Sequence, residues 1–170
     1  MKIEHLEERV SDYNDSISIV VKKKQLWEST AKELIRSTLN KIVALYDIGW
    51  RVQELNWMNA NEAINITFDS FPPSLLDETN KCPSYQFISG GALVFTINYS
   101  GDVHIFISLP IVELISFNES TIDLDFYSPE KISEKLIVEK VDEFLKEMIA
   151  WEVPSAENQR LGFKNSSDNS

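Results

Sequence analysis

Alternation of apolar and polar side chains with a period of two predicts a β-sheet in the middle and second half of the chain. In the first such segment Ile64, Ile66 and Phe68 alternate with polar residues, and Ser100-Gly101 is typical of a short hairpin turn further on. Strands are predicted at 62–69, 85–99, 103–117 and 121–127.

A helical period near 3.6 predicts two long helices, one before and one after these strands. The first covers 23–46 and carries a broad apolar face. The second follows the last strand directly, with Ser128 as the expected N-cap and Pro129 at the first helical position. It runs to Trp151, and Pro154 stops it.

The remaining segments are less regular. Residues 1–10 have the spacing of a short amphipathic helix, and the capping and turn residues of 11–16 predict a break after it. The β-branched run 17–21 fits either a strand or the start of the next helix. Residues 50–58 are interpreted as a further helical turn or two, and 71–84 as a loop that is either functional or mobile.

Together these elements predict an α+β fold: a mostly antiparallel meander of four or five strands with both long helices packed on one face. Two strands have a polar face, so we expect one side of the sheet to meet water. Residues 1–154 are expected to form a single domain and 155–170 a disordered C-terminal tail. A cavity between sheet and helices is possible in such a layout.

The net charge of −11 is unevenly spread over the 170 residues. Residues 22–51 hold seven basic and three acidic residues, whereas 111–152 hold eleven acidic and four basic ones. Phosphate contacts need positive surfaces, so direct binding of nucleic acid is disfavoured. A negative surface can instead speed association with a basic protein partner.

The cell compartment is predicted from what the sequence lacks. The first eight residues are charged and contain no apolar signal segment, and no apolar run is long enough to cross a membrane. The single cysteine, Cys82, cannot form an internal disulfide, which is typical of a reducing compartment. We therefore expect a cytoplasmic protein without a membrane anchor, and Cys82 is interpreted as a spare thiol.

Catalytic patterns are nearly absent from the sequence, so an enzyme is disfavoured, and no metal or cofactor is expected. His104 lies near Asp102 on a predicted strand, but no nucleophile is placed beside it. Asp123 and Asp125 would share one strand face at about 7 Å, which suits either a cation or acid–base pair in a cleft, or a charged edge that resists aggregation. We interpret the pair as a charged edge.

Three functional hypotheses follow. The first is a small acidic protein-binding module, of the immunity, inhibitor or antagonist type, that occupies a basic surface of a partner. The second is a dimeric chaperone or assembly subunit, and the third is an enzyme or ligand carrier with a pocket between sheet and helices. The expected partner-binding side chains combine two tryptophans in polar surroundings, which are either anchors or packing residues, with acidic residues: Trp50, Trp57, Glu119, Asp123, Asp125, Glu130, Glu134, Asp142 and Glu143.

Overall fold

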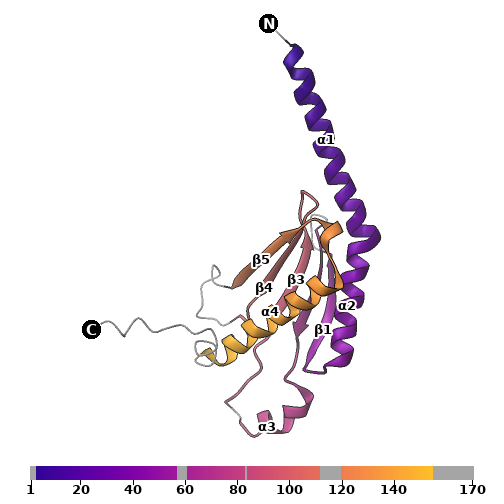
Figure 1. Cartoon of the computed structure of the whole chain (residues 1–170). Coiled ribbons are helices and arrows are strands. Elements are labelled where there is room, and N and C mark those ends of the chain that lie inside the picture. The colour runs from indigo at the N-terminus through magenta and orange to yellow at the C-terminus, as the bar shows by residue number, and fades with distance from the viewer. Residues whose placement is uncertain (1–2, 57–60, 83, 112–119, 155–170) are drawn as a thin grey trace, which may run out of the picture.

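A computed structural model describes residues 3–56, 61–82, 84–111 and 120–154. One helical rod precedes the sheet, and one helix follows it (Figure 1). The helical elements are α1 (Glu4–Leu26), the π-helical turn η1 (Trp27–Ala31), α2 (Lys32–Leu45), the 3-10 turn η2 (Pro73–Leu75), α3 (Leu76–Asn80), the 3-10 turn η4 (Pro129–Lys131) and α4 (Glu134–Glu152). The strands are β1 (Trp50–Asn56), β2 (Glu62–Phe68), β3 (Ala92–Ile97), β4 (Val103–Ser108) and β5 (Thr121–Tyr127).

The five strands form one antiparallel meander in the order β1-β2-β3-β4-β5. The predicted α+β fold is therefore confirmed. Strands β2 and β5 lie where the alternation placed them, whereas β3 and β4 are shorter than expected. The end of the expected 103–117 segment, at 112–119, lies outside the described residues.

The main core lies between α2, α4 and one face of the sheet (Figure 1). Alternate residues of β2, β3 and β4 point into it, as the period of two predicts. Its fully buried side chains come from the helices and from the sheet: Trp27, Ile35, Leu39, Ile137, Phe144, Ile64, Ile66, Leu93, Phe95, Val103, Ile105 and Ile107.

The opposite face of the sheet is also closed at its centre, so the expected wet face is wrong for β2 and β3. Ala63 and Val94 are buried there with Leu55 and Phe106 packed around them. Asn65, which lies on β2 like Ala63, is buried as well. Both faces of the sheet are therefore closed at its centre within the part of the chain that the structure describes.

The N-terminal region is one unbroken helix rather than a short helix and a break. Within the segment 11–16, the side chains bond to their own helix: Arg9 pairs with Asp12 at 2.8 Å, and Ser16 Oγ donates to the Tyr13 carbonyl at 2.7 Å. Turn-forming residues are compatible with a helix when their polar groups are satisfied locally. Residues 17–21, which fitted either a strand or the start of a helix, form part of helix α1.

Two further predictions are corrected. Residues 50–56 form the edge strand β1 and not helical turns, because Gly49 takes a φ of 87° and reverses the chain after α2. Ser128 makes no capping hydrogen bond. The last long helix begins later, where Ser133 Oγ accepts a 3.2 Å bond from the Leu136 amide. Among the described residues, no helix is both long and apolar enough to cross a bilayer.

Candidate functional site

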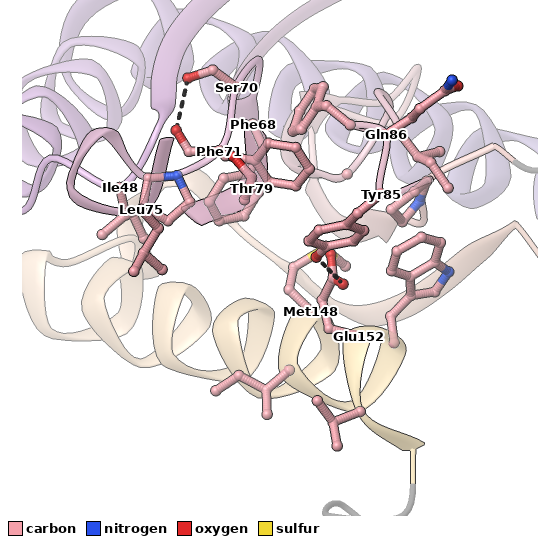
Figure 2. A pocket seen from close by; sticks show the side chains of 18 of the residues that line it. Ile48, Phe68, Ser70, Phe71, Leu75, Thr79, Tyr85, Gln86, Met148 and Glu152 are labelled. Carbon is pink, nitrogen blue, oxygen red and sulfur yellow. Dashed lines mark hydrogen bonds between the residues drawn. The ribbon is translucent and has the colours of Figure 1, made fainter. Parts of the chain in front are cut away.

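A cavity of about 890 Å³ opens between the β2–β3 connection and the C-terminal half of α4 (Figure 2). It lies beyond the end of the sheet, beside the filled sheet–helix core. Its walls are mainly apolar and aromatic and come mostly from three stretches of chain, 68–75, 84–91 and 145–153, with Ile48, Thr79 and Pro110 completing them. Cavities of this size and character are typical binding sites for small molecules.

Gly49 holds the first wall in place. Its carbonyl accepts hydrogen bonds from the Asp69 and Ser70 amides at 3.0 and 3.2 Å. A Cβ at Gly49 would come within 2.3 Å of the Ser70 carbonyl oxygen, so only glycine permits this close approach. The Asp69 carboxylate also pairs with Arg51 at 3.0 Å, which ties the start of the connection to β1. The wall is therefore anchored to the strand edge.

Aromatic rings form the inner lining of the connection. Phe71 packs against Tyr85 with ring centroids 4.9 Å apart, and against Phe87 edge-on at 5.4 Å. Phe68 continues the series into the core, where it contacts Phe144 at 5.7 Å. Edge-to-face and tilted ring pairs stabilise such clusters beyond the area they bury. The rings give the 71–88 segment, which lacks strand pairing, a packing core of its own.

The last turns of α4 supply the facing wall. Met148 is buried there, and a Cβ on Gly91 would approach its Sδ to 2.9 Å, so the sheet end and the helix are in direct contact at this point. Ile149, one position further on, keeps 39% of its surface exposed and lines the open side. The cavity is closed at Met148 and accessible past Ile149.

One polar pair stands at the rim. The Tyr85 hydroxyl donates a 3.0 Å hydrogen bond to the Glu152 carboxylate. Burial raises the pKa of Tyr85, and the bond and the charge of Glu152 raise it further. The phenol therefore remains a donor at neutral pH. The Glu152 carboxylate has lone pairs beyond the one that Tyr85 uses and can accept a donor from a ligand.

Of the two predicted tryptophan anchors, the structure describes Trp50, and its side chain is not exposed. Trp50 is only 5% exposed, stacks on Phe68 at 5.7 Å, and donates its indole N–H to the Tyr46 carbonyl at 2.6 Å. The interpretation of Trp50 as a partly exposed anchor is wrong, because the edge strand turns its side chain into the core. Trp57 and Glu119 lie outside the described residues.

The acidic residues predicted on the last helix are partly neutralised by lysines of the same chain. Glu134 lies 3.5 Å from Lys41, Asp142 lies 2.6 Å from Lys146, and Glu143 lies 2.9 Å from Lys140. Glu130, in the turn before α4, is exposed. The pairs of Glu134 and Asp142 are exposed on both sides and contribute little to stability, and all three pairs reduce the negative field in front of the helix.

Asp123 and Asp125 do not share a face. The register shift between Ile105 and Phe106 sets Asp123 opposite Phe106 and Asp125 opposite Ile105, whose side chains point to opposite sides of the sheet. A hydrogen bond from the Phe126 amide, and then one from Tyr127, lower the pKa of Asp125. The predicted carboxylate pair is therefore replaced by two separate carboxylates.

Asp123 instead meets the histidine that the sequence singled out. Its carboxylate lies 2.9 Å from His104 Nε2, and the imidazole stacks on Phe126 at 4.3 Å with the rings nearly parallel. Asp102, the expected partner of His104, bonds to Lys23 instead. In the described part of the chain, no cluster of His, Cys, Asp and Glu side chains suits a metal ion, and Cys82 is exposed and unpaired.

The cavity was not identified by sequence reasoning, although one signal pointed to it. Phe71, Tyr85, Phe87 and Ile88 are large apolar residues in a segment that needs no strand pairing. Several such side chains in one long connection indicate that the connection packs against another part of the chain. Their partners on α4 follow some 60 residues later, and no periodicity relates the two.

No family model, no curated protein and no solved structure matches this chain.

Proposed function

We propose that this protein is a binding protein that holds a small ligand with an apolar body in the cavity between the β2–β3 connection and α4. The observation that carries the proposal is the cavity itself, about 890 Å³ with aromatic and aliphatic walls. This is the third of the hypotheses drawn from the sequence, without the enzymatic alternative. The third hypothesis expected the pocket between the sheet and the helices, whereas the cavity proposed here lies at the end of the sheet.

The chemistry of the walls limits the ligand. An apolar body would contact Phe71, Phe87 and Met148, and burying it would be favourable by about 25 cal/mol for each Å² removed from water. At the rim, Glu152 favours a ligand that ends in a hydrogen-bond donor or a positive charge over one that ends in a carboxylate. We therefore expect neutral or cationic amphipathic molecules, each with an aromatic or aliphatic body.

Titration with the neutral, apolar dye Nile red tests the proposal. Binding is expected to shift the dye emission to the blue and raise its intensity, with a dissociation constant in the micromolar range. Substituting Ile149→Glu places a charge on the open side of the cavity, which should weaken dye binding at least tenfold. Val138→Glu is the matched control, since Val138 lies on the same helix, is similarly exposed and does not line the cavity.

Two results would contradict the proposal. The wild-type protein could fail to bind Nile red at concentrations up to 100 µM, or the two glutamate variants could lose binding to the same extent. Circular dichroism and a thermal melt of both variants show whether each is folded before the titrations are compared.

The acidic binding module remains a second candidate, supported by the net charge of −11 and by the exposed Asp123 and Glu130. It would act through charge steering, so its complexes should weaken as salt is raised. Affinity capture at 50 mM and 500 mM salt, followed by mass spectrometry, tests it. A basic partner lost at high salt is the expected result, and partners held equally at both salt concentrations contradict it.

A further inference from the structure

Glu152 is the only charged side chain among the described residues that line the cavity. It follows Met148 and Ile149 on α4 by four and three positions, so the three side chains share one face of the helix. Since the cavity is closed at Met148 and accessible past Ile149, the carboxylate stands at its entrance. In the described part of the chain no basic side chain lines the cavity, so a negative charge sets its electrostatic preference.

The end of α4 adds to this negative charge. Glu152 is the last residue of the helix, where the carbonyl groups of the final turn carry a partial negative charge. The Val153 amide bonds to the Ile149 carbonyl at 2.8 Å, which satisfies one of the four carbonyls that a helix end leaves open. The last turn contains no basic residue that would offset the rest. A cation at the entrance would therefore meet both a carboxylate and a helix C-terminus.

Aromatic rings lie directly beside this carboxylate. The Tyr85 hydroxyl donates to Glu152 Oε2 at 3.0 Å (Figure 2), and the Tyr85 ring packs on Phe71 with the centroids 4.9 Å apart. Phe87 meets Phe71 edge-on at 5.4 Å, and Trp151 is a further aromatic residue of the lining. A cation near the carboxylate and within about 6 Å of a ring centroid is attracted by both groups.

The aromatic lining also favours one kind of cation over another. A primary ammonium has three N–H donors, and each of them needs an acceptor when it leaves water. Aromatic rings accept N–H groups only weakly. An alkylated ammonium carries the same charge with fewer N–H groups or none, and its methyl groups contact the faces of rings. Clusters of rings are accordingly the usual binding sites of quaternary ammonium groups.

We propose that the cavity binds an amphipathic ammonium compound, with its alkylated ammonium group at Glu152 and Tyr85 and its apolar body along Phe71, Phe87 and Met148. The inference rests on the proposed function and narrows its ligands to cations with an alkylated nitrogen. Glu152 and the ring of Tyr85 recognise the charge, and the Tyr85 hydroxyl positions the carboxylate. A volume of about 890 Å³ is enough to take up the whole of such a small molecule.

Displacement of Nile red by three ten-carbon compounds tests this inference. Decyltrimethylammonium is the cation, decanol the neutral compound and decanoate the anion, each used below the concentration at which it forms micelles. The apolar chain is nearly constant in the series, and the charge varies. The wild-type protein should bind the cation about tenfold or more tightly than the anion. Equal affinities for the two, or tighter binding of decanoate, would overturn the inference.

Substitution of Glu152 tests the recognition of the charge. Glu152→Gln keeps an acceptor for the Tyr85 hydroxyl and removes the charge, so the affinity for the cation relative to decanol should fall about tenfold. Glu147→Gln is the matched control, because it removes a carboxylate of the same helix that does not line the cavity. Its affinity ratio should equal that of the wild type. The same ratio in all three proteins would contradict the role given to Glu152.

Two substitutions of Tyr85 separate its ring from its hydroxyl. Tyr85→Phe removes only the bond to Glu152, whereas Tyr85→Leu removes the ring as well, so the affinity ratio should fall further in Tyr85→Leu. Equal falls would reject the role of the ring. If neither Nile red nor any of the three compounds binds the wild type, the proposed function and this inference both fail. Binding of Nile red and decanol without preference for the cation would overturn this inference alone.

Discussion

The indole Nε1 of Trp27 donates a 3.0 Å hydrogen bond to the carboxylate of Glu62, the first residue of β2. Lys32 approaches the same carboxylate at 2.9 Å, one helical turn further along the rod. Trp27 is 1% exposed and opens the π-helical turn η1, whose extra residue rotates the helix between its exposed and buried halves. This contact joins the helical rod to the sheet.

Removing the Glu62 carboxylate should therefore loosen the contact between rod and sheet. We expect Glu62→Ala to lower the free energy of unfolding by about 2 kcal/mol, because the buried indole N–H loses its acceptor. Glu62→Gln keeps an acceptor oxygen for Trp27 and loses only the charge that faces Lys32, so it should cost about 1 kcal/mol or less. Urea unfolding followed by fluorescence compares them, and equal losses would contradict the role given to Trp27.

The same carboxylate makes stability depend on pH. The hydrogen bond from Lys32, and then the one from Trp27, lower the pKa of Glu62 below its ordinary value of 4.5. A lowered pKa in the folded state means that the stabilisation is present above pH 4.5 and is lost as pH falls through the folded value. The stability difference between wild type and Glu62→Gln should shrink as urea melts are moved from pH 7 to pH 3. A stability difference that stays constant between pH 7 and pH 3 would count against this role of the Glu62 carboxylate.

Gly49→Ala should damage the cavity wall as well as the fold. The substitution imposes a side chain on a backbone with a φ of 87° and drives a Cβ against the Ser70 carbonyl oxygen. We expect a loss of about 3 kcal/mol or more in unfolding free energy. Gly90→Ala is the control: its φ is 114°, but its nearest neighbour atom would be 3.3 Å away, so it should cost less. Equal losses of unfolding free energy in the two variants would show that the positive φ, and not the contact with Ser70, causes the loss.

Lys140 offers a test of how α4 is held on the sheet. Its side chain is nearly buried, lies 2.9 Å from Glu143, and places Nζ 5.9 Å from the centre of the Tyr127 ring. Lys140→Met should change the unfolding free energy by about 1 kcal/mol or less, because an apolar chain of similar length fills the same space. Lys140→Glu should cost about 2 kcal/mol or more, since it faces Glu143 and Asp125. Thermal melts distinguish the two, and similar midpoints would contradict this account.

The sheet was predictable because the sequences of β2 and β4 alternate with a period of two. Ile64 and Ile66 in β2, and Ile105 and Ile107 in β4, face the main core, and the residues that alternate with them along each strand are mostly polar, so the local pattern indicates both the strand and its core-facing side. The meander order follows from short connections between neighbouring strands.

The failures have a different cause. Tyr13 and the polar residues around it resemble a turn because local propensity ignores the hydrogen bonds that their side chains make within the helix. Trp50 was misplaced because the positive φ of Gly49 depends on the approach of Ser70, a contact that no sequence window contains. The cavity depends in the same way on residues that are far apart in the chain, such as Phe71 and Met148, lining one space.

The rod that begins as α1 and ends as α2 runs without interruption from Glu4 to Leu45. Residues 3–19 of this rod are all exposed and extend about 26 Å past its contact with the sheet, since seventeen helical residues rise 1.5 Å each. The rod therefore acts as a lever whose pivot is the contact of Trp27 with Glu62. A small rotation at that contact would become a larger displacement at Glu4.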